Sequence, residues 1–114
     1  MNVFITGASG FIGGRLVGKL LEDNHKLTIL IRDPLRDQKL ASAGVKTLVG
    51  DLSDKEILKS GMEDCDWVFH LAAHVRPVSS DPGLPFITNV TGTLNVLEAA
   101  REQSVRKIII TSTA

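Results

Sequence analysis

Three glycines spaced three residues apart, Gly7, Gly10 and Gly13, give this sequence its clearest chemical pattern. A glycine has no Cβ, so the backbone N–H groups around it can approach a ligand closely. The apolar run 2–6 precedes the glycines and an apolar run at helical spacing follows them, which predicts a strand, a tight turn and a helix. The N-terminus of such a helix attracts an anion through its unpaired N–H groups and its dipole. We therefore expect the turn to hold the pyrophosphate of a dinucleotide; the alternative is a tightly packed corner that binds nothing.

Strand and helix patterns alternate along the whole chain, and they must position this turn. The predicted strands are residues 2–6, 26–31, 45–49, 67–71 and 107–111. One predicted helix follows Gly10, and the next covers residues 35–43. Another begins at a cap at Ser53 or Asp54, and the last extends from about 86 to 103. This alternation predicts an α/β fold, a Rossmann-type doubly wound parallel sheet with strand order 3-2-1-4-5 and helices on both faces. We expect one dinucleotide-binding domain over 1–114, with its ligand crevice at the carboxyl ends of the first and fourth strands.

Apolar residues at helical spacing predict which face of two helices is buried. For the helix after the glycines they are Phe11, Ile12, Leu16, Val17, Leu20 and Leu21. For the last helix they are Phe86, Val90, Leu94, Leu97 and Ala100.

Composition and charge exclude several classes of partner. Charged residues make up 23% of the 114 residues and balance to a net charge of zero, which gives no electrostatic footprint for nucleic acid or an anionic membrane. No apolar run approaches the roughly 20 residues that cross a bilayer. The single cysteine, Cys65, allows no internal disulfide, and no secretory signal precedes the first strand. We expect a cytoplasmic protein with a small-molecule substrate and no nucleic-acid or membrane partner.

Two histidines near the end of the fourth predicted strand, His70 and His74, are four residues apart. No third ligand stands at a suitable spacing, so we expect no metal site there. Each histidine is expected to be either hydrogen-bonded inside the protein or facing solvent.

Five segments in order resemble one family, the extended short-chain dehydrogenases/reductases, also called the NAD-dependent epimerase/dehydratase family. They are the glycine motif at 6–13, Gly-Asp-Leu at 50–52, His-Leu-Ala-Ala at 70–73, the Asn-Val-x-Gly-Thr motif and its continuation at 89–99, and Thr-Ser-Thr-Ala at 111–114. The run Ile-Arg-Asp-Pro at 31–34 is similar to dihydroflavonol-reductase-like members.

The resemblance implies a set of cofactor-binding residues: Gly7, Ser9, Gly10, Phe11, Ile12, Gly13, Arg32, Asp51, Leu52, Leu71, Ala72, Ala73, Asn89, Thr111 and Ser112. In this family Asp51 would accept a hydrogen bond from the adenine amino group, and Leu52 would pack beside the ring. Residues 71–73 would form a smooth shelf under the cofactor, and Asn89 would hold the loop over it. The alternatives are a turn or cap role for Asp51 and for Asn89, and ordinary tight packing for the two alanines.

The choice between NAD and NADP depends on the residue that ends the second strand. An acid there accepts hydrogen bonds from the ribose hydroxyls of NAD, whereas an arginine pairs with the 2′-phosphate of NADP. Aligning by strand end puts Arg32 at this position, but Asp33 stands at the spacing of an NAD-type acid. We favour NADP, since Arg36 and Lys39 would add positive charge nearby; the alternative is a solvated turn before Pro34.

The chain contains no tyrosine. In the family, a Tyr-x-x-x-Lys pair beyond the fifth strand exchanges a proton with the substrate, assisted by a serine or threonine that matches Thr113 here. We therefore expect the amino-terminal, cofactor-binding part of a longer reductase, epimerase or dehydratase, truncated after the fifth strand and inactive alone. We also expect a homo-oligomer, formed through the exposed strand edge at 107–111 or the long helix. The alternatives are a nucleotide-sugar epimerase/dehydratase and a non-catalytic NAD(P)-sensing module.

Overall fold

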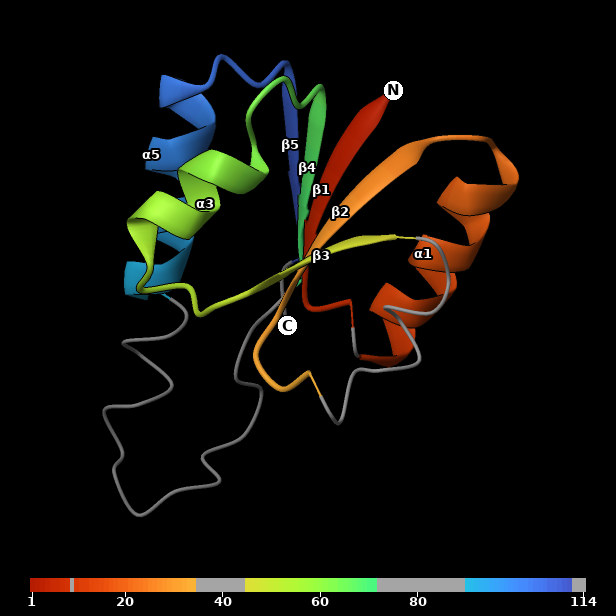
Figure 1. Cartoon of the computed structure of the whole chain (residues 1–114). Coiled ribbons are helices and arrows are strands. Elements are labelled where there is room, and N and C mark those ends of the chain that lie inside the picture. The colour runs from red at the N-terminus through yellow and green to blue at the C-terminus, as the bar shows by residue number, and fades with distance from the viewer. Residues whose placement is uncertain (9, 35–44, 72–89, 112–114) are drawn as a thin grey trace.

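The computed structural model of the chain describes residues 1–8, 10–34, 45–71 and 90–111 (Figure 1). The helix predicted over 35–43 and the start of the last predicted helix lie outside these residues. So do six of the predicted site residues: Ser9, Ala72, Ala73, Asn89, Ser112 and Thr113.

Five parallel strands form one sheet in the part of the chain that the structure describes. They are β1 (Asn2–Thr6), β2 (Lys26–Ile31), β3 (Lys46–Val49), β4 (Trp67–His70) and β5 (Lys107–Ile110). Their order is β3-β2-β1-β4-β5, which confirms the predicted Rossmann-type order. The chain winds from β1 to β3 in one direction and continues from β4 to β5 in the other, so the winding reverses between β1 and β4.

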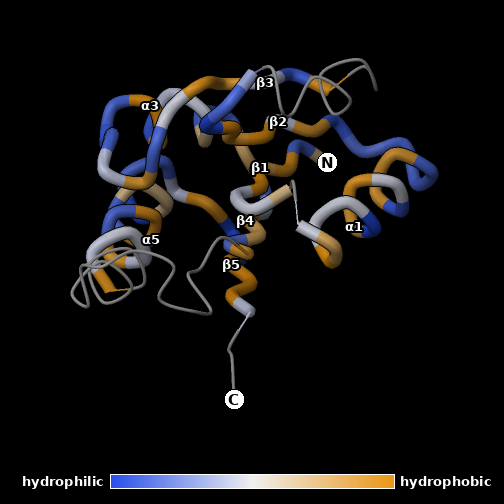
Figure 2. The backbone as a smooth tube through the Cα atoms, turned by 90° about the horizontal axis from the view of Figure 1, so that it is seen from below, coloured by the Kyte–Doolittle hydropathy of each residue, from blue (hydrophilic) through white to orange (hydrophobic). Residues whose placement is uncertain are grey.

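Helices cover both faces of the sheet, as the alternation predicted. Helix α1 (Phe11–Glu22) lies on one face, and α3 (Lys55–Gly61) and α5 (Gly92–Glu102) lie side by side on the other (Figures 1 and 2). The Asp54 carboxylate caps α3 by accepting a hydrogen bond from the Ile57 N–H at 3.3 Å, so Asp54 and not Ser53 is the cap.

The alternation of side chains along β1 divides the core into two layers. Val3 and Ile5 face α1, where they pack with Val17 and Leu20. Phe4 faces α3 and α5. On that second face the fully buried side chains include Leu58, Met62, Val68 and Val96.

The buried face of α1 differs from the prediction at its first turn. Val17 and Leu20 are buried as predicted, but Phe11 and Ile12 are 76% and 64% exposed. Both residues lie in the first turn of α1, directly after Gly10, and the core cluster under this helix includes neither of them.

The predicted buried face of α5 is mostly wrong. Val90, Leu94 and Leu97 are exposed, and Ala100 is buried. The face toward the core is made of Gly92, Asn95, Val96, Ala99 and Ala100. Small residues allow α5 to approach the core closely: a Cβ at Gly92 would stand 2.8 Å from the side chain of Leu52. The leucines of α5 therefore point outward.

Candidate functional site

The turn after β1 has a geometry that only glycine fits at two positions. Gly7 has φ of +80°, a left-handed conformation that a side chain strains. A Cβ at Gly13 would meet the Gly7 carbonyl oxygen and stand 2.7 Å from the Ala8 Cα, so α1 rests directly on the turn. At Gly10 an added Cβ would make only ordinary contact, 3.5 Å from the Gly7 oxygen. The glycine spacing therefore sets how close the helix stands to the turn.

The N-terminus of α1 opens at this turn without a capping side chain. Its cap residue is Gly10, whose backbone is extended and which has no side chain to accept from the first-turn N–H groups. No acidic residue stands in the first turn of α1. The exposed backbone amides and the helix dipole together favour an anionic group at this position.

The register of the sheet brings together the ends of the first and fourth strands, where the crevice is predicted. Thr6 pairs with His70, and the Leu71 N–H donates to the Thr6 carbonyl oxygen at 3.0 Å. Gly7 and Leu71 therefore leave neighbouring strands side by side, at the point where the winding reverses. Thr111 lies beside them, since its N–H donates to the His70 carbonyl oxygen at 3.3 Å. Ligands of doubly wound sheets bind at this position.

Arg32 and Asp51 lie on the β2–β3 side of the same edge, and both are exposed. The Gly50 N–H donates to the Ile31 carbonyl oxygen at 2.9 Å, which brings the two segments together. The Asp51 Oδ1 accepts a hydrogen bond from the Ser53 N–H at 2.9 Å, so Asp51 organises the turn before α3. A carboxylate has a second oxygen, so this turn leaves it able to accept from a ligand.

Leu52 is only 8% exposed and belongs to the core under α5. The amide of Asn95 on α5 donates to the Leu52 carbonyl oxygen at 2.9 Å. This hydrogen bond fastens the loop that contains Asp51 onto helix α5. The proposed contact of Leu52 with an adenine ring stays a prediction.

Two hydrogen bonds, one buried and one part-buried, join three side chains beneath the reversal point, and the sequence reasoning found only the central histidine. His70 is 3% exposed, and burial lowers its pKa. Its Nδ1 is 2.7 Å from the Thr6 Oγ1, and its Nε2 is 2.9 Å from the Thr93 Oγ1. The prediction of a histidine hydrogen-bonded within the protein is confirmed for His70. Among the described residues, no cluster of three or more His, Cys, Asp or Glu side chains is placed to hold a metal ion.

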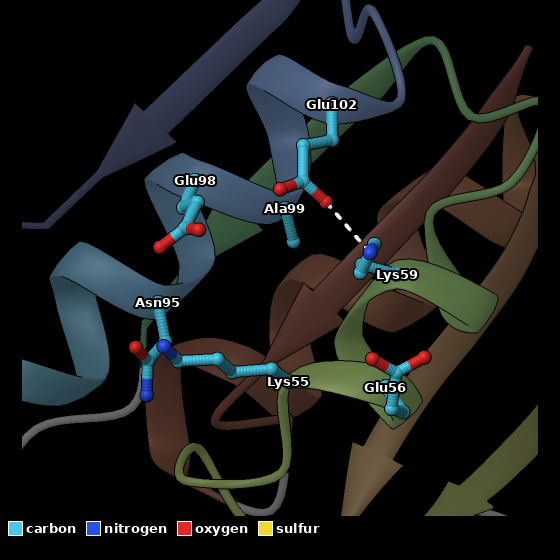
Figure 3. Close-up of a pocket in the computed structure, with 7 residues that line it drawn as sticks. All are labelled: Lys55, Glu56, Lys59, Asn95, Glu98, Ala99 and Glu102. Carbon is cyan, nitrogen blue, oxygen red and sulfur yellow. Dashed lines mark ion pairs between the residues drawn. The ribbon is translucent and has the colours of Figure 1, made fainter.

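A small pocket of about 60 Å³ lies apart from this edge, between α3 and α5 (Figure 3). Its charged residues carry both signs, and Lys59 and Glu102 form an ion pair at 2.9 Å across it. The Lys59 ammonium donates a hydrogen bond to the Glu102 carboxylate, and this interaction raises the pKa of Lys59. This pocket has room for water but not for a nucleotide. The glycine turn is the candidate site because of its backbone geometry and the uncapped start of α1.

No helix within the described ranges combines the length and the apolar character that a bilayer crossing needs.

Comparison with known proteins places this arrangement in context. The model of the family described as "NAD dependent epimerase/dehydratase family" matches residues 3–114. A putative dihydroflavonol 4-reductase of Synechocystis sp. is 35% identical over 109 residues, which cover 96% of this chain and 32% of that protein.

Two solved structures extend the comparison. A Thermus thermophilus UDP-glucose 4-epimerase in complex with NAD has a TM-score of 0.84 and 33% identity, covering 99% of this chain and 38% of that chain. Yeast methylglyoxal/isovaleraldehyde reductase Gre2, complexed with NADPH, shares the fold at a TM-score of 0.86 and 24% identity, over 99% of this chain and 37% of that chain. This chain spans about a third of the length of these three proteins.

Proposed function

Because the chain belongs to the NAD-dependent epimerase/dehydratase family, we propose that it binds NAD(P) as the cofactor-binding part of an enzyme. The enzyme would pass hydride between the nicotinamide and a hydroxyl- or carbonyl-bearing small molecule. One observation supports the binding proposal. The tight turn at Gly7 and the close approach of Gly13 to the Gly7–Ala8 backbone place the uncapped backbone amides of α1 where the winding of the sheet reverses. A diphosphate matches the charge preference of that arrangement.

The proposed binding residues divide along the edge of the sheet. The diphosphate lies on the glycine turn, with Phe11 and Ile12 exposed beside it. The adenosine lies toward β2 and β3, where Arg32 and Asp51 are exposed. The nicotinamide lies toward β4 and β5, at the backbone that follows His70 and at Thr111.

We propose NADP as the cofactor, read by Arg32. The exposed guanidinium at the end of β2 is free to pair with a 2′-phosphate through charge-assisted hydrogen bonds. Titrating the full-length protein with NADPH and NADH tests this, and tighter binding of NADPH is expected. Arg32→Ala should weaken NADPH binding by about 1.5–3 kcal/mol and leave NADH nearly unchanged. Equal affinity for both cofactors in the unaltered protein would refute the assignment.

The chemistry itself is proposed from the family. Thr113 would hydrogen-bond the substrate oxygen, and a Tyr-x-x-x-Lys pair in the full-length enzyme would exchange the proton. We favour a reductase, because residues 31–34 and the similarity to a putative dihydroflavonol 4-reductase both support that class. NADPH oxidation by the full-length protein, measured with aldehydes, ketones and nucleotide sugars, tests the class. Epimerisation and dehydration are redox-neutral and regenerate the cofactor, so conversion of nucleotide sugars without net NADPH oxidation would replace the reductase with an epimerase or dehydratase.

We also propose that the protein forms a homo-oligomer through α5. Leu94 and Leu97 are 59% and 37% exposed on the outward side of this helix, and Val90, two residues before α5 begins, is 41% exposed. Light scattering of the full-length protein should give a dimer or larger species. Leu94→Asp should shift it toward the monomer, while Glu98→Gln on the same helix should not. A monomer at high concentration would contradict the proposal.

The proposed location is the cytoplasm. Cys65 is a buried free thiol whose pKa is raised by burial, so the thiol stays un-ionised and unreactive. A structure stabilised without a disulfide suits a reducing compartment. Cell fractionation tests this, and recovery in a secreted or membrane fraction would refute it.

A further inference from the structure

Three polar side chains from three different elements form one hydrogen-bonded network, buried at Thr6 and His70 and part-buried at Thr93, beneath the point where the winding reverses. Thr6 ends β1, His70 ends β4, and Thr93 stands in the first turn of α5. The two hydrogen bonds, at 2.7 Å and 2.9 Å, join residues that are 64 and 23 positions apart in the sequence. The network therefore ties the two strands at the reversal point to the beginning of the helix.

The imidazole at the centre of this network depends on both threonines. A neutral imidazole has one N–H donor and one acceptor nitrogen, and a hydroxyl can act in either role. With both nitrogens bonded, the buried ring is satisfied. Removing either hydroxyl leaves a buried ring nitrogen without that partner, which is costly in the low dielectric of the interior. Burial also lowers the pKa of His70, which favours the neutral ring.

The network lies on one half of the proposed cofactor site. Thr6 directly precedes Gly7, and His70 directly precedes Leu71, so the two strand ends that flank the reversal point are held together below it. The groups proposed to read the adenosine half lie on the other side, after β2 and β3. Loss of these hydrogen bonds should therefore weaken binding of the nicotinamide half of the ligand more than binding of the adenosine half.

We propose that Thr6, His70 and Thr93 are positioning residues for the nicotinamide half of the cofactor. They contact no reacting atom; they hold in place Gly7 and Leu71, which directly follow β1 and β4, and the start of α5. This inference rests on the proposed dinucleotide function. It predicts that breaking the network at Thr93 weakens the whole dinucleotide while leaving its adenosine half bound as before.

The test compares two ligands on one variant. Thr93→Val in the full-length protein keeps the side-chain shape and removes the hydroxyl, and affinities are measured for NADPH and for adenosine 2′-monophosphate, or for NADH and adenosine, since these adenosine ligands lack the phosphates that would reach the glycine turn. The Kd of the dinucleotide should rise about 5- to 30-fold, the effect of losing one buried hydrogen bond. The Kd of the adenosine half should stay within about twofold, as for an independent site. Thr93→Ser, which keeps the hydroxyl, should restore dinucleotide binding.

A control at the other end of α5 separates positioning from general destabilisation. The Gln103 side chain donates to the Lys59 carbonyl oxygen at 3.0 Å, away from the crevice. Gln103→Leu removes this hydrogen bond and should leave both affinities within about twofold. Equal loss of both ligands in Thr93→Val, no loss of either, or the same selective loss in Gln103→Leu would overturn the inference.

A measurement on the unaltered protein covers the case in which Thr93→Val does not fold. The ring ¹⁵N signals of His70 should report one neutral tautomer, and they should shift when the dinucleotide binds but not when the adenosine half binds. The same shift with both ligands would overturn the inference. If the unaltered protein bound neither ligand, the proposed function would fail and this inference with it. If it bound both ligands but Thr93→Val weakened them equally, or the His70 signals shifted equally with both, only the inference would be refuted.

Discussion

Replacing Gly13 by alanine places a methyl group against the backbone of the glycine turn. The new Cβ would meet the Gly7 carbonyl oxygen and stand 2.7 Å and 3.0 Å from the Ala8 Cα and carbonyl carbon. These are main-chain atoms, which cannot rotate away as a side chain can. The clash is relieved only if α1 moves off the turn or the turn itself shifts.

The expected loss of stability is the balance of two effects. Alanine is favoured over glycine within a helix by about 1 kcal/mol. Forcing an extra carbon into a packed site costs about 1–3 kcal/mol, and we take the upper end because the neighbours of Gly13 are backbone. The free energy of unfolding should therefore fall by about 2 kcal/mol. Dinucleotide binding should weaken roughly tenfold or more, since displacing the helix amides weakens charge-assisted hydrogen bonds to phosphate.

The matched control is Gly18→Ala on the same helix. No atom lies within 4 Å of a Cβ added there, so only the helix preference acts. Gly18→Ala should gain about 0.5–1 kcal/mol in stability and leave dinucleotide affinity unchanged. Urea denaturation of the full-length protein and titration calorimetry with NADPH measure both quantities. The reasoning is refuted if Gly13→Ala is as stable as Gly18→Ala and binds the cofactor equally well.

Three further predictions follow from single contacts. Burial lowers the pKa of His70 from 6.5, so below about pH 6.5 the unfolded chain binds a proton at this residue and the folded chain does not. The free energy of unfolding should therefore fall as the pH decreases, by at most about 1.4 kcal/mol per pH unit, until the pH reaches the folded pKa. Denaturant titrations from pH 7.5 to 5.5 should show this slope, and an identical slope in His70→Gln would assign it to another group. Asp54→Ala removes the cap on the Ile57 N–H and should cost about 1 kcal/mol, while Asp54→Asn should retain most of it; equal losses in the two variants would contradict capping. Asn95→Leu leaves the Leu52 carbonyl without its donor and should cost about 1–3 kcal/mol by urea denaturation; an unchanged midpoint would show that the hydrogen bond contributes nothing.

The strand order and the point where the winding reverses could be predicted from the sequence, because both follow from local patterns and general rules of winding. The runs around Gly7 fixed β1, the turn and α1, and alternation gave the strand order. The cap at Asp54 was one of two residues proposed from cap preference. Which side chains pack against each element, and which form hydrogen bonds with it, depend on the folded structure.

The errors have a common physical origin, which is that apolar periodicity does not identify the contact face when small residues make the contact. Leu94 and Leu97 repeat at helical spacing, yet Gly92 and Ala99 allow the closer approach and take the buried side of α5. The same limit applies to Phe11, which lies in the first turn of its helix and outside the core.

The hydrogen bonds of His70 could not be predicted from one sequence. They join three elements through the register of β1 with β4 and the position of α5, and no local pattern encodes either. One signal in the sequence could have suggested the Thr6–His70 hydrogen bond: a threonine and a histidine end two strands that are predicted to be neighbours.

A crystal structure of the full-length protein with bound NADPH tests the central claim most directly. The account predicts diphosphate oxygens within hydrogen-bonding distance of the backbone N–H groups of the first turn of α1, with Gly7 and Gly13 in van der Waals contact beneath them. A diphosphate bound elsewhere, or a glycine turn filled by the protein's own side chains, would contradict it.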